Sequence, residues 1–105
     1  MKNKDVIEQF ARGKREGKGN SVFIEGNVIY SYGHHFPMAI RLFDTEGFKF
    51  IWNRDHYSQT TKKCQNWLFD AIGGKDKIVK EVITPQMEHY KKFTSVREVI
   101  LEALD

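Results

Sequence analysis

Residues 21–53 constrain the fold most strongly, because apolar side chains there recur at alternate positions between turn-forming sequences. Gly26-Asn27 is typical of a two-residue hairpin, and Asp44–Gly47 fits a type I turn. Short alternating strands joined by tight turns pair with their neighbours in sequence. We therefore predict a four-stranded antiparallel meander with one face covered by helices. Its strands are Val22–Ile24, Val28–Tyr32, Met38–Phe43 and Phe48–Trp52.

The residues on both sides of this region follow the spacing of helices instead. Residues 3–14 carry one apolar stripe at helical spacing, and Asn3 precedes it as an N-cap. Residues 59–72 carry a second stripe, which lies between an N-cap at Ser58 and a stop at Gly73. We expect a helix at each of these places.

The C-terminal third is less uniform. Residues 77–83 fit either a helix or a strand, because their apolar positions suit a helix and their β-branched content suits a strand. Thr84-Pro85 is typical of a helix start, and Ser95–Glu98 is a capping box that opens the last helix. The predicted fold class is α+β, with the meander packed by an N-terminal helix and two to four C-terminal helices.

A basic, glycine-rich stretch interrupts the pattern at residues 12–20, where four basic residues accompany three glycines. We expect it to be a flexible basic connector within one domain. The chain has 105 residues, of which 40% are hydrophobic and 30% charged. That composition and length suit one packed core, so we predict a single α+β domain over residues 1–105.

Several classes of protein find no support in this sequence. No apolar run is long enough to cross a membrane, and the basic start is not followed by the apolar stretch of a secretory signal. The single cysteine, Cys64, cannot form an internal disulfide, which favours a reducing, cytoplasmic compartment. No P-loop, GxGxxG, GxSxG or HExxH motif occurs, so we predict no cofactor.

Two polar loops form the candidate site. The second and fourth strands of an antiparallel meander run parallel to each other, so the loops after Tyr32 and after Asn53 leave the same end of the sheet. We expect their side chains to converge there, where basic and amide groups suit contact with a phosphate backbone. The predicted binding residues are Tyr32, His34, His35, Arg54, Tyr57, Thr60, Thr61, Lys62 and Gln65, together with Arg12 and Arg15 of the connector.

Catalysis and metal binding are the alternatives at these loops. His34 or His35 with Asp55 supplies the residue types of a small metal-dependent nuclease or hydrolase. Adjacent histidines in a regular strand face opposite ways, whereas in a loop both could bind one ion. The spacing still does not favour a metal site, because no CxxC or HxxxH pair occurs. The Asn, Asp and Ser residues at 53–58 are also ordinary components of a turn and helix cap. We therefore predict no catalytic set and no metal site.

The two loops also resemble a two-part signature of small proteins of unknown function from phages, archaea and mobile elements. The first part, S-Y-G-x-H-F-P-(aliphatic)-A, is matched by Ser31, Tyr32, Gly33, His35, Phe36, Pro37, Met38 and Ala39. The second part, N-x-D-x-Y-S-x-T-T-x-x-x-Q, is matched by Asn53, Asp55, Tyr57, Ser58, Thr60, Thr61 and Gln65. The likeness covers residues 28–67 and implies that His35, Tyr57, Thr60, Thr61 and Gln65 belong together. It implies a phage or mobile-element origin and no particular activity.

Three functions stay open. The first is a small non-enzymatic binding protein that contacts nucleic acid or a nucleic-acid-bound host complex. The second is a protein–protein inhibitor of a host defence system, similar to an anti-CRISPR protein, or a dimeric adaptor that pairs through an apolar helix face. This second reading follows from analogy of size and origin. The third is the nuclease or hydrolase that uses His34 or His35 with Asp55.

Overall fold

A computed structural model describes all of residues 1–105 and shows an α+β fold built on one six-stranded sheet. The strand order is β1-β2-β3-β4-β5-β6, so every strand lies beside its neighbours in sequence. The first five strands are antiparallel, and β6 pairs parallel to β5. The elements are α1 (Asn3–Ala11), β1 (Glu16–Lys18), β2 (Val22–Glu25), β3 (Val28–Ser31), β4 (Pro37–Asp44), β5 (Gly47–Asn53), α2 (Gln59–Ile72), the 3₁₀ turn η1 (Lys75–Lys77), β6 (Ile78–Val82), α3 (Thr84–Tyr90) and α4 (Val96–Ala103).

The four predicted strands are present, but the sheet gains one strand at each edge. Strand β1 lies inside the stretch that we expected to be a flexible connector. Its sequence, Glu-Gly-Lys, carries no apolar alternation, so periodicity could not reveal it. Residues 78–82 form β6, which decides the ambiguity at 77–83 in favour of a strand. The parallel pairing of β6 follows because α2 crosses one face of the sheet and returns the chain in the direction of β5.

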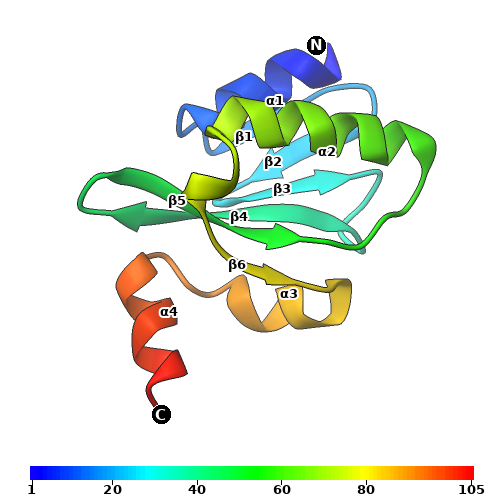
Figure 1. Ribbon diagram of the computed structural model, residues 1–105. Helices are drawn as coiled ribbons and strands as arrows, with labels where there is room; N and C mark the ends of the chain where they lie inside the picture. The colour runs from blue at the N-terminus through cyan, green and yellow to red at the C-terminus, as the bar shows by residue number, and fades with distance from the viewer.

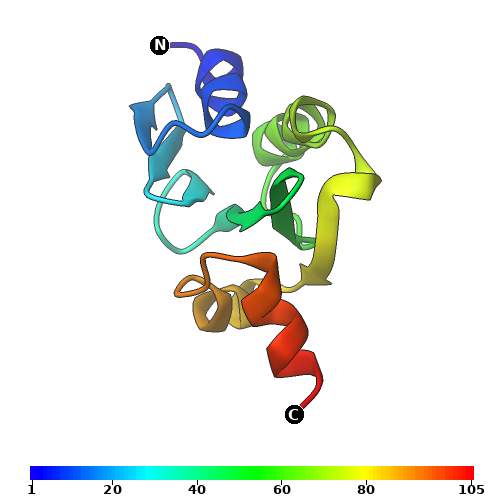
Figure 2. The same cartoon turned by 90° about the vertical axis from the view of Figure 1, so that its left-hand side faces the viewer.

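Helices cover both faces of the sheet, which corrects the expectation of one covered face. Helices α1 and α2 lie on one side, and α3 and α4 lie on the other, as Figures 1 and 2 show. Two separate apolar clusters fill the two interfaces. The first includes Val6, Phe10, Ile29, Phe50, Trp52, Cys64 and Leu68, and the second includes Val28, Tyr30, Ile40, Ile51, Met87, Tyr90 and Val99.

The helix boundaries follow the predicted caps at three of four places. The Ser58 hydroxyl accepts a hydrogen bond from the backbone N–H of Thr61, and α2 ends at Gly73 with φ 103°. Ser95 and Glu98 form the expected capping box of α4. The fourth expectation was wrong, because Lys2 is the N-cap of α1. The Asn3 side chain instead accepts hydrogen bonds from the backbone N–H groups of Ser21 and Val22 and so ties α1 to β2.

Arg41 of β4 is the largest fully buried side chain, although a charged residue in a strand normally faces solvent. Its guanidinium donates to the carbonyl oxygens of Phe10, Lys14 and Gly26 and to Asn27 Oδ1, at 2.7–3.2 Å. No carboxylate lies within ion-pair distance of it. Burial, with a smaller contribution from the charge of Arg15, lowers the pKa of Arg41 to about 10.

None of the helices combines the length and apolar character needed to span a bilayer.

Candidate functional site

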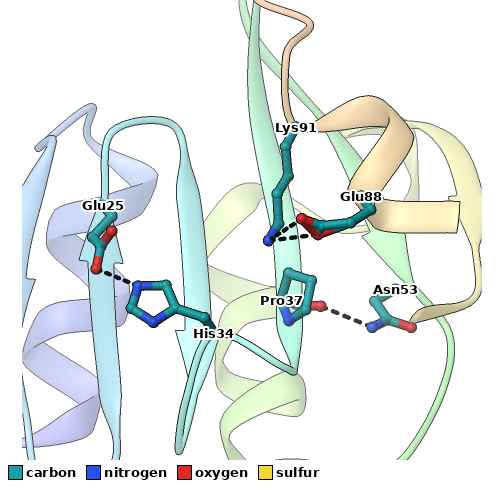
Figure 3. A network of polar contacts seen from close by, with 6 residues as sticks. All are labelled: Glu25, His34, Pro37, Asn53, Glu88 and Lys91. Atoms are coloured by element: carbon teal, nitrogen blue, oxygen red, sulfur yellow. Dashed lines mark hydrogen bonds and ion pairs between the residues drawn. The ribbon is translucent and has the colours of Figure 1, made fainter. Parts of the chain in front are cut away.

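The two loops singled out in the sequence lie side by side at one end of the sheet. Strands β3 and β5 both run antiparallel to β4, so both finish at the same end of the sheet. The hydroxyls of Ser31 and Thr61 lie 2.8 Å apart, which joins the end of β3 to the first turn of α2. Asn53 Nδ2 donates to the carbonyl oxygen of Pro37 at 2.8 Å, as Figure 3 shows, which joins β5 to β4.

A buried polar network supports the loop between β5 and α2. Gln65, only 5% exposed, donates from Nε2 to the backbone oxygen of Asp55 at 2.8 Å. Asn53 is fully buried and donates to both Pro37 O and Thr84 Oγ1. Three polar residues of the second signature part (Asn53, Thr61 and Gln65) are therefore buried and fix the loop from within.

Asp55 connects this network to α3. Its carboxylate accepts a 2.7 Å hydrogen bond from the backbone N–H of Thr84, the first residue of α3. Hydrogen bonds from the backbone and side chain of Thr84 hold the pKa of Asp55 below its ordinary value. The carboxylate thus stabilises a helix start, where a negative charge is favourable.

Three rings gather on the outside of the two loops. Tyr57 packs against Tyr32, with ring centroids 5.8 Å apart, and against His35 at 5.2 Å. It also contacts Phe36, which is buried beneath it. Tyr32 and Tyr57 are 51% and 53% exposed, which is unusual for two neighbouring tyrosines. We call Tyr32, His35 and Tyr57 the aromatic platform.

The backbone at Tyr32 has φ 68°, and it is the only non-glycine residue of the chain with positive φ. Tyrosine rarely adopts this left-handed conformation, which costs about 1–3 kcal/mol. The backbone N–H of Tyr32 bonds to the carbonyl oxygen of Ser21 at 2.6 Å, which holds the residue in place. Local strain of this kind concentrates at functional positions, so it marks Tyr32 within the platform.

A second feature, which we call the basic hollow, lies beside the same loop. It has a volume of about 290 Å³ between the end of β5 and one side of α2. Arg54, His56 and Lys62 supply its basic groups, and Gln65 and Asn66 supply amides. Lys62, Asn66 and Phe69 recur at helical spacing along α2, a pattern that could have indicated this shared face.

His34 does not join the platform, in contrast to our expectation that it would converge with His35. Its Nε2 lies 2.5 Å from Glu25 Oε2, and its ring packs against Phe23 and Tyr30, as Figure 3 shows for the Glu25 contact. The two adjacent histidines lie in a turn, and they point to different sides of the loop because His34 contacts Glu25 and His35 packs on Tyr57.

Lys91 lies near the aromatic rings that surround His34, in particular that of Tyr30. Its Nζ is 5.0 Å from the centre of the Tyr30 ring and 2.9 Å from Glu88 Oε2 (Figure 3). Burial by itself lowers the pKa of Lys91. The hydrogen bond to Glu88 and the proximity of Tyr30 outweigh this effect and raise the pKa above its ordinary value.

The remaining predicted residues divide between the site and the rest of the molecule. Thr60 is exposed in the first turn of α2, beside the platform loop. Arg12 follows α1, and Arg15 Nη1 donates to Asn27 Oδ1 in the turn that precedes β3. That turn lies at the opposite end of β3 from Tyr32, so Arg15 does not join the site.

The structure does not bring together the histidine and aspartate residues of the enzyme alternative. His34 is bound to Glu25, and the Asp55 carboxylate is bound to the backbone of α3. No hydrogen bond joins His34 or His35 to Asp55, and no group of three or more His, Cys, Asp or Glu side chains is arranged to hold a metal ion.

No protein-family model, no curated protein and no solved structure matches this chain. The geometry of the site is therefore the basis for the function proposed next.

Proposed function

We propose that this protein is a non-enzymatic binding protein that contacts single-stranded nucleic acid, alone or within a host nucleoprotein complex. The observation that carries the proposal is the pair of half-exposed tyrosines, Tyr32 and Tyr57, next to the basic hollow. Proteins that bind single strands combine aromatic side chains, on which bases stack, with a positively charged path for the backbone. Both parts are present at one end of this sheet.

The platform supplies the stacking. The Tyr32 and Tyr57 rings are tilted by 49° to each other, so they offer their faces to two different bases. Base–aromatic stacking contributes about 1–3 kcal/mol per base and tolerates any sequence. The buried network under the loop holds Tyr57 in position, so little conformational entropy is lost on binding.

The basic hollow supplies the phosphate contacts. Arg54 and Lys62 make no ion pair within the protein, so both charges are free for a ligand. Two phosphate contacts on a single strand give a salt dependence of about −1.4 on a logarithmic scale, or roughly sevenfold weaker binding between 50 and 200 mM salt. The formal net charge of +3 adds only a modest general attraction.

The test is a fluorescence anisotropy titration of labelled oligothymidylate and oligouridylate, each of about 12 nucleotides, with a duplex of the same length as comparison. We expect the single strands to bind more tightly than the duplex. Tyr57→Ala and Tyr32→Ala should each weaken binding at least fivefold, since each removes one stacked base. Lys62→Ala should weaken binding and reduce the salt dependence.

Two matched controls locate the effect. Phe43→Ala removes an aromatic residue of similar exposure, 54%, near the end of β4, and should leave binding unchanged. Lys75→Ala removes an exposed charge from η1 and should leave the salt dependence unchanged. Absence of saturable binding to every probe would refute the proposal. Equal losses in the platform variants and in Phe43→Ala would refute the assigned site.

A further inference from the structure

Strand β1 leaves one edge of the sheet unpaired. It lies at the end of the strand order and pairs only with β2 (Figure 2). Gly26 N–H bonds to Arg15 O and Gly19 N–H bonds to Val22 O, so positions 15, 17 and 19 direct their backbone groups to β2. The backbone groups of Glu16 and Lys18 therefore face outward, because hydrogen-bonding direction alternates along a strand.

The charges on this edge are self-complementary. Glu16 and Lys18 are exposed and take part in no ion pair. An antiparallel pair of β1 strands related by a two-fold axis at Gly17 places Glu16 of each copy opposite Lys18 of the other. The same register matches the outward N–H and C=O groups, since Glu16 and Lys18 then form the hydrogen-bonded pairs.

Gly17 suits the centre of such a pair. At the axis, Gly17 meets its own copy in a non-hydrogen-bonded position, where Cα atoms approach to about 4.5 Å. Gly17 has no side chain to obstruct this approach, and a Cβ there would lie 3.3 Å from Gln9 Oε1 on the α1 side. The strand is therefore free of bulk where two copies come closest.

We propose that two copies of this chain associate through β1, in register about Gly17, so that their two six-stranded sheets become continuous. Charged side chains commonly protect a sheet edge from pairing with another chain, and like charges that lie directly opposite each other repel. This edge carries one charge of each sign, in the order that attracts a second copy. A groove of about 610 Å³ borders the edge, lined by β1, β2, Tyr32 and His34, and the added strand extends its wall.

A like-charged pair within one copy also favours association through β1. Glu16 of β1 lies directly opposite Glu25 of β2. Like charges in this position destabilise a strand pair. A lysine from a second copy beside Glu16 offsets that repulsion, whereas nothing in the single chain does so at Glu16.

Sedimentation equilibrium over a range of protein concentrations tests the proposal. We expect the mass to rise from 12.3 kDa toward twice that value as concentration increases. Glu16→Lys and Lys18→Glu should each weaken association about tenfold, because two attractive cross-strand pairs become repulsive. The double exchange restores both pairs with reversed charges and should restore association. Glu16→Lys also creates a favourable pair with Glu25, so the variant is expected to fold.

Helix α4 is the other surface to test for association, because its apolar residues Ile100, Leu101 and Leu104 are exposed. Leu101→Glu should leave β1-mediated association unchanged. A mass that stays at 12.3 kDa throughout, or a dimer that Leu101→Glu abolishes and Glu16→Lys does not, would overturn the proposal. The proposal would also be overturned if the variant with both Glu16→Lys and Lys18→Glu associated no more strongly than either single variant.

Discussion

The side-chain amide of Asn53 lies 2.8 Å from the carbonyl oxygen of Pro37, and this buried hydrogen bond helps to link the two loops that carry the candidate site. The same amide also donates to Thr84 Oγ1 at the start of α3. Asn53 thereby connects β4, β5 and α3 at one point inside the protein. The geometry of the aromatic platform therefore depends on buried residues beneath the two loops as well as on the three exposed rings.

Asn53→Ala should destabilise the fold by about 1–3 kcal/mol, because it leaves the buried oxygen of Pro37 without its donor. Urea denaturation measures the change. Asn66→Ala, on the exposed side of α2, is the control and should change stability by less than about 0.5 kcal/mol. Equal effects of the two variants would show that the Asn53 network contributes no more than a surface amide.

Arg41→Met should cost about 2–4 kcal/mol, although replacing a buried charge by an apolar side chain is often neutral. The difference lies in its partners, which are three carbonyl oxygens and an amide oxygen rather than a carboxylate. These acceptors lose their donor when the guanidinium is removed. Denaturant midpoints for Arg41→Met and Arg41→Lys measure the effect, with the lysine variant retaining part of the stability. A loss below about 1 kcal/mol for Arg41→Met would contradict this role.

The elements that the sequence predicted correctly are those with a local signal in the sequence. Alternation gave the four central strands, and cap residues such as Ser58 and Ser95 gave the helix starts, because these signals are set within a few residues. The parallel direction of β3 and β5 followed from the meander, and with it the meeting of the two loops.

The parts that escaped prediction are set by tertiary contacts. Strand β1 is a strand only because β2 pairs with it, and β6 shows three exposed positions in a row rather than alternation. The two directions of His34 and His35 depend on Glu25 and Tyr57, which lie on other elements. Arg41 is buried because the end of α1 and the turn before β3 supply its acceptors, a distant combination that sequence spacing does not show.

Asp55 predicts part of the acid sensitivity of the protein. Its pKa is lowered in the folded state, so the folded protein binds fewer protons here than the unfolded chain does. The stabilisation is complete above the unfolded pKa and is lost as pH falls through the folded value, that is, from about pH 4 downward. Asp55→Asn cannot titrate and should lose less stability between about pH 6 and pH 3.

Urea midpoints at the two pH values measure this difference. Some acid sensitivity should persist in the variant, because hydrogen bonds also lower the pKa of Glu98 at the start of α4. Asp76→Asn, an exposed carboxylate of η1, is the control and should keep the acid dependence of the wild type. Identical pH dependence in Asp55→Asn and wild type would show that the contact with Thr84 does not contribute.

Tyr32 should show opposite effects on stability and on binding. Its φ of 68° is costly for tyrosine and free of cost for glycine, while its ring is 51% exposed and contributes limited packing. Tyr32→Gly should therefore keep or raise stability, by up to about 1 kcal/mol, because relief of strain offsets the greater entropy of the unfolded chain. If the ring stacks on a base, the same variant should bind oligothymidylate at least fivefold more weakly.

The comparison with Tyr57 makes this prediction specific. Tyr57 has ordinary backbone geometry and packs on Tyr32, His35 and Phe36, so Tyr57→Ala should lose both binding and some stability. Denaturation and anisotropy measured on the same preparations separate the two effects. A Tyr32→Gly variant that is less stable by more than about 1 kcal/mol would mean that the ring contributes more to folding than the strain costs. A more stable variant with unchanged binding of oligothymidylate would instead show that the Tyr32 ring does not contribute to recognition.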